Sequence, residues 1–297
     1  MKRHLLSLVA IAAMALGSSA YAGPVIIDGT DSADHGDNSG GTNNLGWEYM
    51  QRALTNLGSS VSGSVNKTVQ VIGADTGSQA YNAITSAFNL SGLIGAGWNI
   101  QYVQGAAAIN TFMAGLSTAN TGILYMSTAG LVSGDMDAAE LAAVNASSAA
   151  INTFVSGAGN PAQGGALFSQ GEFGTNAYGW LSALIPGIVS TSVGTGGVGT
   201  DILLTAAGAT AFPGLTNADL AGADPWHNHF SGNLGGLSVL GRTAAGEQVI
   251  LGGGAGTVLQ CGQPGQPACP TPEPGSMLLV AAAGLALLGV RRRRFGL

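Results

Sequence analysis

Residues 122–127 read GILYMS and residues 164–169 read GGALFS, and these two short apolar stretches decide the fold. Between them, the segment from Asp135 to Val155 has acidic residues in its first turns, where the helix dipole favours them, and predicts one long helix. A strand, a helix and a second strand in this order are typical of a βαβ unit, in which the two strands are parallel. The stretch therefore predicts a parallel sheet that is covered on both faces.

The same alternation continues on both sides of this unit. Short apolar or alternating segments predict strands at residues 24–27, 69–72, 98–103, 202–204, 237–240 and 248–251. Apolar residues at helical spacing predict helices at residues 47–57, 80–88, 109–116 and 178–185. Residues 243–247 separate the last two strands in a hairpin pattern. We therefore expect one α/β domain over residues 23–260, with a mainly parallel, doubly wound sheet flanked by helices and a C-terminal β-hairpin.

The composition excludes several classes of protein. The chain has 297 residues, of which 49 are Gly and only 8% are charged, so it is neither a basic nucleic-acid-binding protein nor a charge-rich disordered chain. The glycines follow no three-residue period, which excludes collagen. Residues 23–270 contain three basic residues and 14 of the 15 acidic residues, a net charge of −11. We expect such a domain to be soluble, to be repelled by nucleic acid and to attract divalent cations.

The first 22 residues have the pattern of a secretory signal peptide. A short basic start at residues 1–4 precedes an apolar run at residues 5–16, and Ala20 and Ala22 occupy the two positions that signal peptidase reads. The alternative is a retained anchor, for which the apolar run is short. We expect signal peptidase to remove residues 1–22 and the mature chain to begin near Gly23.

The last 27 residues, 271–297, contain three features in order. A Pro-Glu-Pro motif comes first, then an apolar segment at residues 277–290, then a cluster of arginines that favours the cytoplasmic side of a membrane. The residues of the motif and the cluster are Pro272, Glu273, Pro274, Arg291, Arg292, Arg293 and Arg294. This arrangement resembles the PEP-CTERM sorting tail of exported bacterial proteins, a tail also described as the C-terminal domain of ice-binding proteins.

The resemblance implies a route and a set of partners. An exosortase would remove the tail after residues 277–290 had held the chain transiently in the inner membrane as a short transmembrane helix. The protein would then reach the cell surface or the extracellular space of a bacterium that makes exopolysaccharide. The alternative is an ordinary C-terminal membrane anchor, from which the tail is not removed.

The two cysteines, Cys261 and Cys269, lie in the sequence CGQPGQPAC just before the tail. In an oxidising compartment this spacing predicts a disulfide that closes the Pro/Gly-rich linker at residues 261–270. Metal binding is the less favoured alternative, since no further Cys or His lies nearby in the sequence.

Residues 122–173 carry a second resemblance, to the class I glutamine amidotransferase-like architecture, a doubly wound fold of the flavodoxin type. The family has a cysteine nucleophile on a sharp turn after a strand. At the corresponding turn this chain has Ser169, Gln170 and Gly171, and it has no cysteine apart from Cys261 and Cys269. The resemblance therefore implies the fold and excludes amidotransferase activity.

Candidate metal ligands gather in two places. A polar loop from Asp28 to Asn44 follows the first predicted strand and carries the candidate ligands Asp31, Asp34, His35 and Asp37. Together with Asp28 these are four carboxylates within ten residues, and they repel one another unless a cation or hydrogen-bond donors offset them. His227 and His229 are two positions apart, so on an extended segment their side chains project to the same face. If the fold brings the two places together, they form a site for a divalent cation. The alternative is that the acidic residues cap the next helix and that the histidines bond backbone groups.

These observations predict a non-enzymatic exported protein of the cell surface or extracellular matrix, with a binding or structural role linked to exopolysaccharide and no catalytic residues assigned. The alternative is a metal-dependent hydrolase of the cell envelope that uses the Asp and His cluster.

Overall fold

In the computed structural model, the described residues are 23–61, 65–127, 134–157, 164–171, 177–193, 201–221 and 226–254. They fall within one compact unit, residues 1–258. The predicted signal peptide, the linker with Cys261 and Cys269, and the predicted sorting tail lie outside the described residues. Within the described ranges, no helix combines the length and the hydropathy needed to span a membrane.

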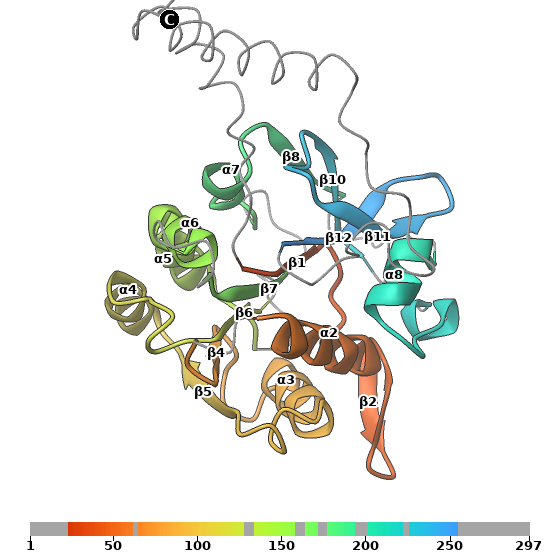
Figure 1. The fold of residues 1–297 in the computed structure, drawn as a ribbon, viewed down its shortest axis with the longest axis horizontal. Helices are drawn as coiled ribbons and strands as arrows, with labels where there is room; N and C mark the ends of the chain where they lie inside the picture. Colours follow the sequence, from red (N-terminus) through yellow and green to blue (C-terminus); the bar gives the residue numbers. More distant parts are fainter. Residues whose placement is uncertain are drawn as a thin grey trace, which may run out of the picture. The chain divides into compact units, whose positions relative to one another are not determined.

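Ten strands of the described chain form one mixed sheet, and a two-stranded sheet lies beside it. The bounds of the strands are β1 Val25–Asp28, β2 Gly36–Ser39, β3 Thr42–Leu45, β4 Thr68–Ile72, β5 Asn99–Val103, β6 Ile123–Met126, β7 Ala166–Gln170, β8 Ile188–Ser192, β9 Ile202–Leu204, β10 Asn228–Gly232, β11 Ser238–Thr243 and β12 Gln248–Gly253. Five parallel strands stand in the order β5-β4-β6-β7-β1, and β12, β10 and β8 continue the sheet in antiparallel pairs (Figure 1).

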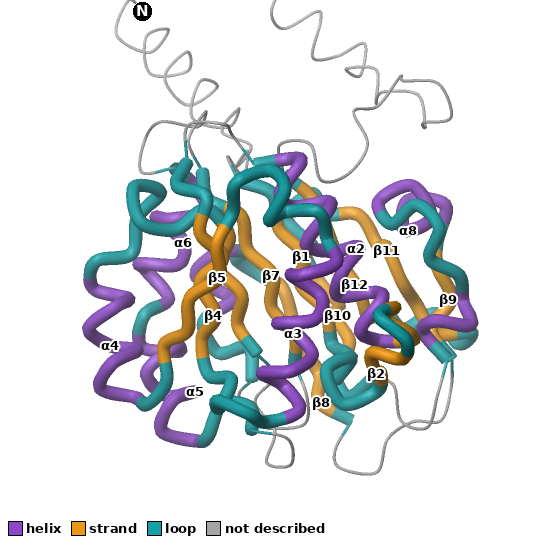
Figure 2. The backbone as a smooth tube through the Cα atoms, turned by 90° about the horizontal axis from the view of Figure 1, so that it is seen from below, coloured by secondary structure: helices purple, strands orange, loops and turns teal. Residues whose placement is uncertain are grey.

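Helices cover both faces of the sheet. Their bounds are α2 Gly46–Ser60, α3 Gln79–Leu90, α4 Ala106–Ala114, α5 Ala138–Ala146, α6 Ser148–Ser156, α7 Leu181–Leu184, α8 Ala206–Ala211 and the 3₁₀ helix η2 Asn217–Leu220. Side chains alternate along a strand, so the neighbours Val25 and Ile26 belong to opposite hydrophobic cores. Ile26 packs in the core with α2, α3 and α8, and Val25 packs with α4, α5, α6 and α7. Figure 2 shows α2 and α3 together over one face.

The predicted fold class is confirmed, since a large, mainly parallel sheet lies between two layers of helices. A flavodoxin-like sheet has the strand order 2-1-3-4-5. When β4 is taken as the first strand, β5-β4-β6-β7 gives 2-1-3-4, and β1 occupies the fifth place. The N-terminal strand therefore stands where the last parallel strand of that order would be.

The predicted C-terminal hairpin is confirmed by the antiparallel pair of β11 and β12, in which Val239 lies opposite Leu251. β11 also pairs with β9, so the hairpin is extended by one further strand.

The prediction of one long helix from Asp135 to Val155 is wrong in one respect, because the segment forms two helices, α5 and α6. Asp137 is the N-cap of α5 and forms a capping box with Glu140, so the start lies close to the prediction. The break comes at Ser147, whose hydroxyl bonds to the carbonyl oxygen of Ala143 at 2.8 Å. Serine side chains compete with the helix backbone for hydrogen bonds in this way.

The predicted polar loop from Asp28 to Asn44 contains the β2–β3 hairpin, whose side chains are mostly exposed. Four short elements, β8, β10, α8 and η2, were not predicted as strands or helices, although the segment of β10 was expected to be extended. Their apolar patterns are too short to show a period.

Candidate functional site

The candidate site lies at the carboxyl ends of β1, β6 and β7. Parallel strands end at the same edge of a sheet, and ligands of open α/β sheets bind there. The segment that precedes β10 reaches this edge through backbone contacts with the loop after β1. The N–H groups of His227 and Asn228 donate to the carbonyl oxygen of Gly29 at 2.8 and 3.1 Å, and Thr30 pairs with Trp226 in an isolated bridge. Residues far apart in the sequence thus meet at this edge.

Asp31 joins the two histidines that the sequence analysis placed in separate segments. Its Oδ2 lies 2.9 Å from Nε2 of His35 and 3.0 Å from Nε2 of His227. The side chains of Asp31 and His227 are only 5% and 4% exposed, whereas that of His35 is 31% exposed. The predicted convergence of the two places therefore occurs for these three residues.

These contacts shift the pKa values of Asp31 and His35 in opposite directions. Burial favours the neutral form of Asp31, but the hydrogen bonds from His227 and His35 outweigh it and lower the pKa of Asp31. The hydrogen bond to Asp31 raises the pKa of His35 against the smaller opposing effect of burial. The ion pair of Asp31 with His35 is therefore favoured over a wide range of pH.

The other three predicted ligands make different contacts. Asp37 is exposed on β2 and accepts a hydrogen bond from Nδ2 of Asn44 at 2.8 Å. The ring of His229 packs edge-on against Trp226, with ring centroids 6.0 Å apart. Asp34 is half-buried in the loop before β2, and its charge contributes to the raised pKa of His35.

Within the ranges that the structure describes, no group of three or more His, Cys, Asp or Glu side chains could hold a metal ion. The six residues predicted as ligands are all described, and the closest three are arranged as a hydrogen-bonded cluster around Asp31. The geometry gives the cation hypothesis no support, and it stays a prediction.

A second polar cluster surrounds Asp28, the last residue of β1, whose side chain is fully buried. Oδ1 accepts from the backbone N–H and the hydroxyl of Thr30 at 2.7 and 2.6 Å, and Oδ2 accepts from the hydroxyl of Tyr49 at 2.7 Å. Nε2 of Gln170 lies 3.5 Å from Oδ2. Burial raises the pKa of Asp28 to about 7, although these hydrogen bonds oppose the shift. Asp28 is therefore a buried carboxyl group that changes its protonation near neutral pH.

Three tyrosines complete the polar surroundings of Asp28. Besides the Tyr49 contact, the hydroxyl of Tyr125 donates to Oε1 of Gln170 at 2.7 Å, and the hydroxyl of Tyr178 bonds to the backbone oxygen of Asp28. Burial raises the pKa of all three tyrosines well above its ordinary value. Sequence analysis missed these partners because each tyrosine stands in an apolar pattern that reads as core. The hydroxyl groups of these tyrosines, which are polar groups within apolar patterns, are the only signal in the sequence that pointed to a buried polar cluster.

Ser169, which occupies the turn position of the family's nucleophile, lies inside β7 and is 1% exposed. A nucleophile of this type needs a sharp, strained turn that exposes its side chain. Among the described residues, the one non-glycine residue with a positive φ is Leu45, so Ser169 has no such strain. The described geometry of Ser169 is that of a buried strand residue.

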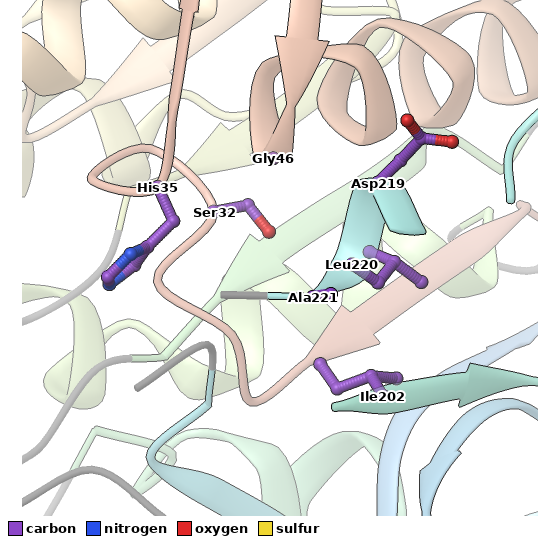
Figure 3. Close-up of a pocket in the computed structure, with 7 residues that line it drawn as sticks. All are labelled: Ser32, His35, Gly46, Ile202, Asp219, Leu220 and Ala221. Carbon is purple, nitrogen blue, oxygen red and sulfur yellow. The ribbon is translucent and has the colours of Figure 1, made fainter. Parts of the chain in front are cut away.

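A small surface pocket adjoins the loop after β1. Its lining residues are Ser32, His35, Gly46, Ile202, Asp219, Leu220 and Ala221, and its volume is about 10 Å³, room for about one water molecule. Figure 3 shows the Ser32 hydroxyl directed toward the space bounded by Gly46, Leu220 and Ala221, while the ring of His35 is turned away from it. Ser32 is therefore the polar side chain that links this pocket to the loop.

Replacing Gly29 with Ala is expected to lower the free energy of unfolding by about 2 kcal/mol. A Cβ atom at residue 29 would lie 1.8 Å from the carbonyl oxygen of Asn228, so the loop after β1 and the start of β10 would have to separate. Urea denaturation followed by tryptophan fluorescence measures the effect. Gly115→Ala is the control, since its Cβ would meet nothing closer than 3.8 Å. Equal effects of the two substitutions would contradict the close approach at Gly29.

The site thus combines a proton-binding group, Asp28, with a fixed charge, Asp31, that orients two imidazole rings. Sequence reasoning identified the second arrangement in part and gave Asp28 no separate role. No family model, curated protein or solved structure matches this chain, so its function is argued from these residues.

Proposed function

We propose that this chain is an exported protein of the cell surface or extracellular matrix, processed by signal peptidase and an exosortase. In this proposal the α/β domain has a non-enzymatic binding or structural role linked to exopolysaccharide. The two terminal patterns support the route, and the net charge of −11 over residues 23–270 supports a domain that stays soluble after export.

One observation carries the non-enzymatic role: the ionisable side chains at the carboxyl edge bond to other parts of the domain. Asp31 holds His227 and His35 through one oxygen, and both oxygens of Asp28 accept hydrogen bonds from buried donors. A general acid or base must lie within hydrogen-bond reach of its substrate, whereas Asp28, Asp31 and His227 are almost fully buried. The contacts favour groups that stabilise the fold.

The same contacts do not favour the alternative of a metal-dependent hydrolase. Such an enzyme needs at least three protein ligands and an open position on the metal. The hydrogen-bonded cluster of Asp31, His35 and His227 does not offer that set among the described residues.

The export route is tested by following the full-length chain in a bacterium that has an exosortase and in a strain from which the exosortase gene has been deleted. We expect the wild-type protein outside the cell to begin near Gly23 and to lack the arginine cluster, as read from its intact mass. Replacing Pro272, Glu273 and Pro274 together with Ala is expected to leave the tail in place and the protein bound to the cell. Pro264→Ala with Pro267→Ala, two linker prolines outside the motif, is the matched control and should be processed normally. Wild-type protein that is exported with its arginines, or that stays inside the cell, would refute the route.

The role of the domain is tested separately with the purified mature protein. We expect it to co-sediment with exopolysaccharide and to show no turnover of a polysaccharide and ester panel, with or without added divalent metal. Turnover that is lost in both His227→Ala and Asp34→Ala would overturn the non-enzymatic role and support the hydrolase.

A further inference from the structure

Three side-chain oxygen atoms form a row that starts inside the domain and ends at the surface pocket. Oδ1 of Asp28 lies 2.6 Å from the hydroxyl oxygen of Thr30, which lies 2.6 Å from the hydroxyl oxygen of Ser32. The three residues are two positions apart in the sequence, from the last residue of β1 through the bridge residue Thr30 to the turn at Ser32, and the hydrogen bonds place their side chains side by side. Both distances are those of good O–H···O hydrogen bonds.

The two ends of the row differ in their surroundings. At the inner end, Asp28 is fully buried, and its carboxyl group also accepts from the backbone of Thr30 and from Tyr49. At the outer end, Ser32 is 4% exposed and lines the pocket beside Gly46 (Figure 3). Thr30, in the middle, is 1% exposed. The row thus connects a carboxyl group without access to water with a pocket that is large enough for one water molecule.

A hydroxyl group can donate one hydrogen bond and accept others, so this row can run in either direction. When Asp28 is ionised, Ser32 donates to Thr30, and Thr30 donates to Asp28. When Asp28 carries its proton on Oδ1, that proton is donated to Thr30, Thr30 donates to Ser32, and Ser32 donates into the pocket. Both arrangements keep every bond of the row, so a change of protonation costs no contact.

We propose that Asp28, Thr30 and Ser32 form a reversible hydroxyl relay through which the buried carboxyl group of Asp28 exchanges its proton with solvent in the pocket. On ionisation, the proton of Asp28 moves to the oxygen of Thr30, the hydroxyl proton of Thr30 moves to Ser32, and the hydroxyl proton of Ser32 moves to a water molecule in the pocket. Each hydroxyl loses one proton and gains another, so the net change is one proton from Asp28 to water. The relay makes Asp28 a pH-responsive group although it is fully buried.

The other groups that face Asp28 do not compete for this proton near neutral pH. Tyr49 of α2, Tyr125 of β6 and Tyr178 all act on Asp28 or feel its charge, and each has a pKa well above its ordinary value of 10.0, so all three stay neutral. From β7, the facing residue is the uncharged Gln170. On the loop of Asp28 itself, Asp31 and His35 bond to each other. Asp28, whose pKa burial raises to about 7, is therefore the group that exchanges here.

The relay is tested by infrared spectroscopy of the mature protein during pH jumps across neutrality. A buried protonated carboxyl group gives a separate C=O stretching band, which Asp28→Asn should remove and so assign. In the wild-type protein we expect this band to respond in one fast phase. Ser32→Ala is expected to lose the fast phase while the pH midpoint of the band stays close to that of the wild type, because Ser32 does not touch Asp28.

Ser169→Ala is the matched control, since Ser169 is another buried hydroxyl at the same edge but outside the row. It should keep the fast phase. If Ser32→Ala does not fold, Thr30→Val takes its place, with Thr30→Ser as the variant that retains the hydroxyl and should retain the fast phase. A fast phase that persists in Ser32→Ala, or in a folded Thr30→Val, would overturn the relay. So would the absence of a band that depends on Asp28.

Discussion

Replacing Asp28 with Asn is expected to remove a large part of the pH dependence of stability. In the folded chain the pKa of Asp28 is about 7, against an ordinary value of 3.8. Between these values the folded state holds a proton that the unfolded state has released, so the free energy of unfolding falls as pH rises. A separation of about three pKa units corresponds to about 4 kcal/mol. The Asn variant does not titrate, so its free energy of unfolding minus that of the wild type should rise by about 4 kcal/mol between about pH 4 and about pH 8.

Urea denaturation of both proteins at a series of pH values, followed by tryptophan fluorescence, measures this difference. The comparison cancels the titration of the other groups as long as the variant keeps their surroundings. Asp37→Asn is the control, because it makes the same chemical change at an exposed carboxylate. A change with pH as large as that of Asp28→Asn would contradict the assignment of this titration to Asp28. A constant difference for Asp28→Asn would show that Asp28 is ionised in the folded protein at all of these pH values.

Replacing Asp31 with Ala is expected to lower the free energy of unfolding by about 3 kcal/mol near pH 6, because it removes one buried acceptor that two imidazole rings share. His227 is almost fully buried and would lose the 3.0 Å contact of its Nε2 with Asp31, and His35 would lose its 2.9 Å contact. The effect combines two contacts, so it should exceed that of removing either histidine alone. Chemical denaturation at fixed pH measures it.

The pH dependence of Asp31 has the opposite sign to that of Asp28. The pKa of Asp31 is lowered, so its contribution is present above its ordinary pKa of 3.8 and is lost as pH falls through the folded value. The pKa of His35 is raised, so its contribution is present below its ordinary value of 6.5 and is lost as pH rises through the folded value. The destabilisation by Asp31→Ala should therefore be greatest between these limits.

A double-mutant cycle of Asp31→Ala and His227→Ala should give a coupling energy of more than about 1 kcal/mol, because residues in direct contact do not act independently. His229→Ala, paired with Asp31→Ala, is the matched control and should be additive, since the ring of His229 packs on Trp226 instead. Additivity in both cycles would mean that the contact of Asp31 with His227 contributes nothing to stability.

The elements of the fold were largely predictable, whereas the order of the strands was not. Apolar runs such as residues 123–126 and 69–72 carry the strand signal locally, and the structure places strands at both. The position of β1 beside β7 is set by which surfaces pack together over the whole domain. No pattern within residues 25–28 distinguishes this place, between β7 and β12, from any other place in the sheet.

The candidate site was predictable only in part, for a related reason. The types and spacing of Asp31, His35 and His227 pointed to a common site, and the fold brings these three together. His229 also carries an imidazole ring, but this ring packs edge-on against Trp226 and, within the described chain, forms no hydrogen bond with Asp31. Besides Thr30, two partners of Asp28 come from α2 and β7, and only the packed structure shows that a tyrosine and a glutamine contact the same carboxyl group.

The antiparallel pairing of β1 with β12 has a mechanical consequence. Val25 lies opposite Gly253, so the first residues of β1 and the last residues of β12 are neighbours, at the end of these strands away from Asp28. A load applied across residues 23 and 254 would pull apart two neighbouring strands from their common end, and their hydrogen bonds would open one after another. The domain should therefore yield at low force when stretched between these points, and it should accept insertion into a loop of another protein, which requires adjacent ends.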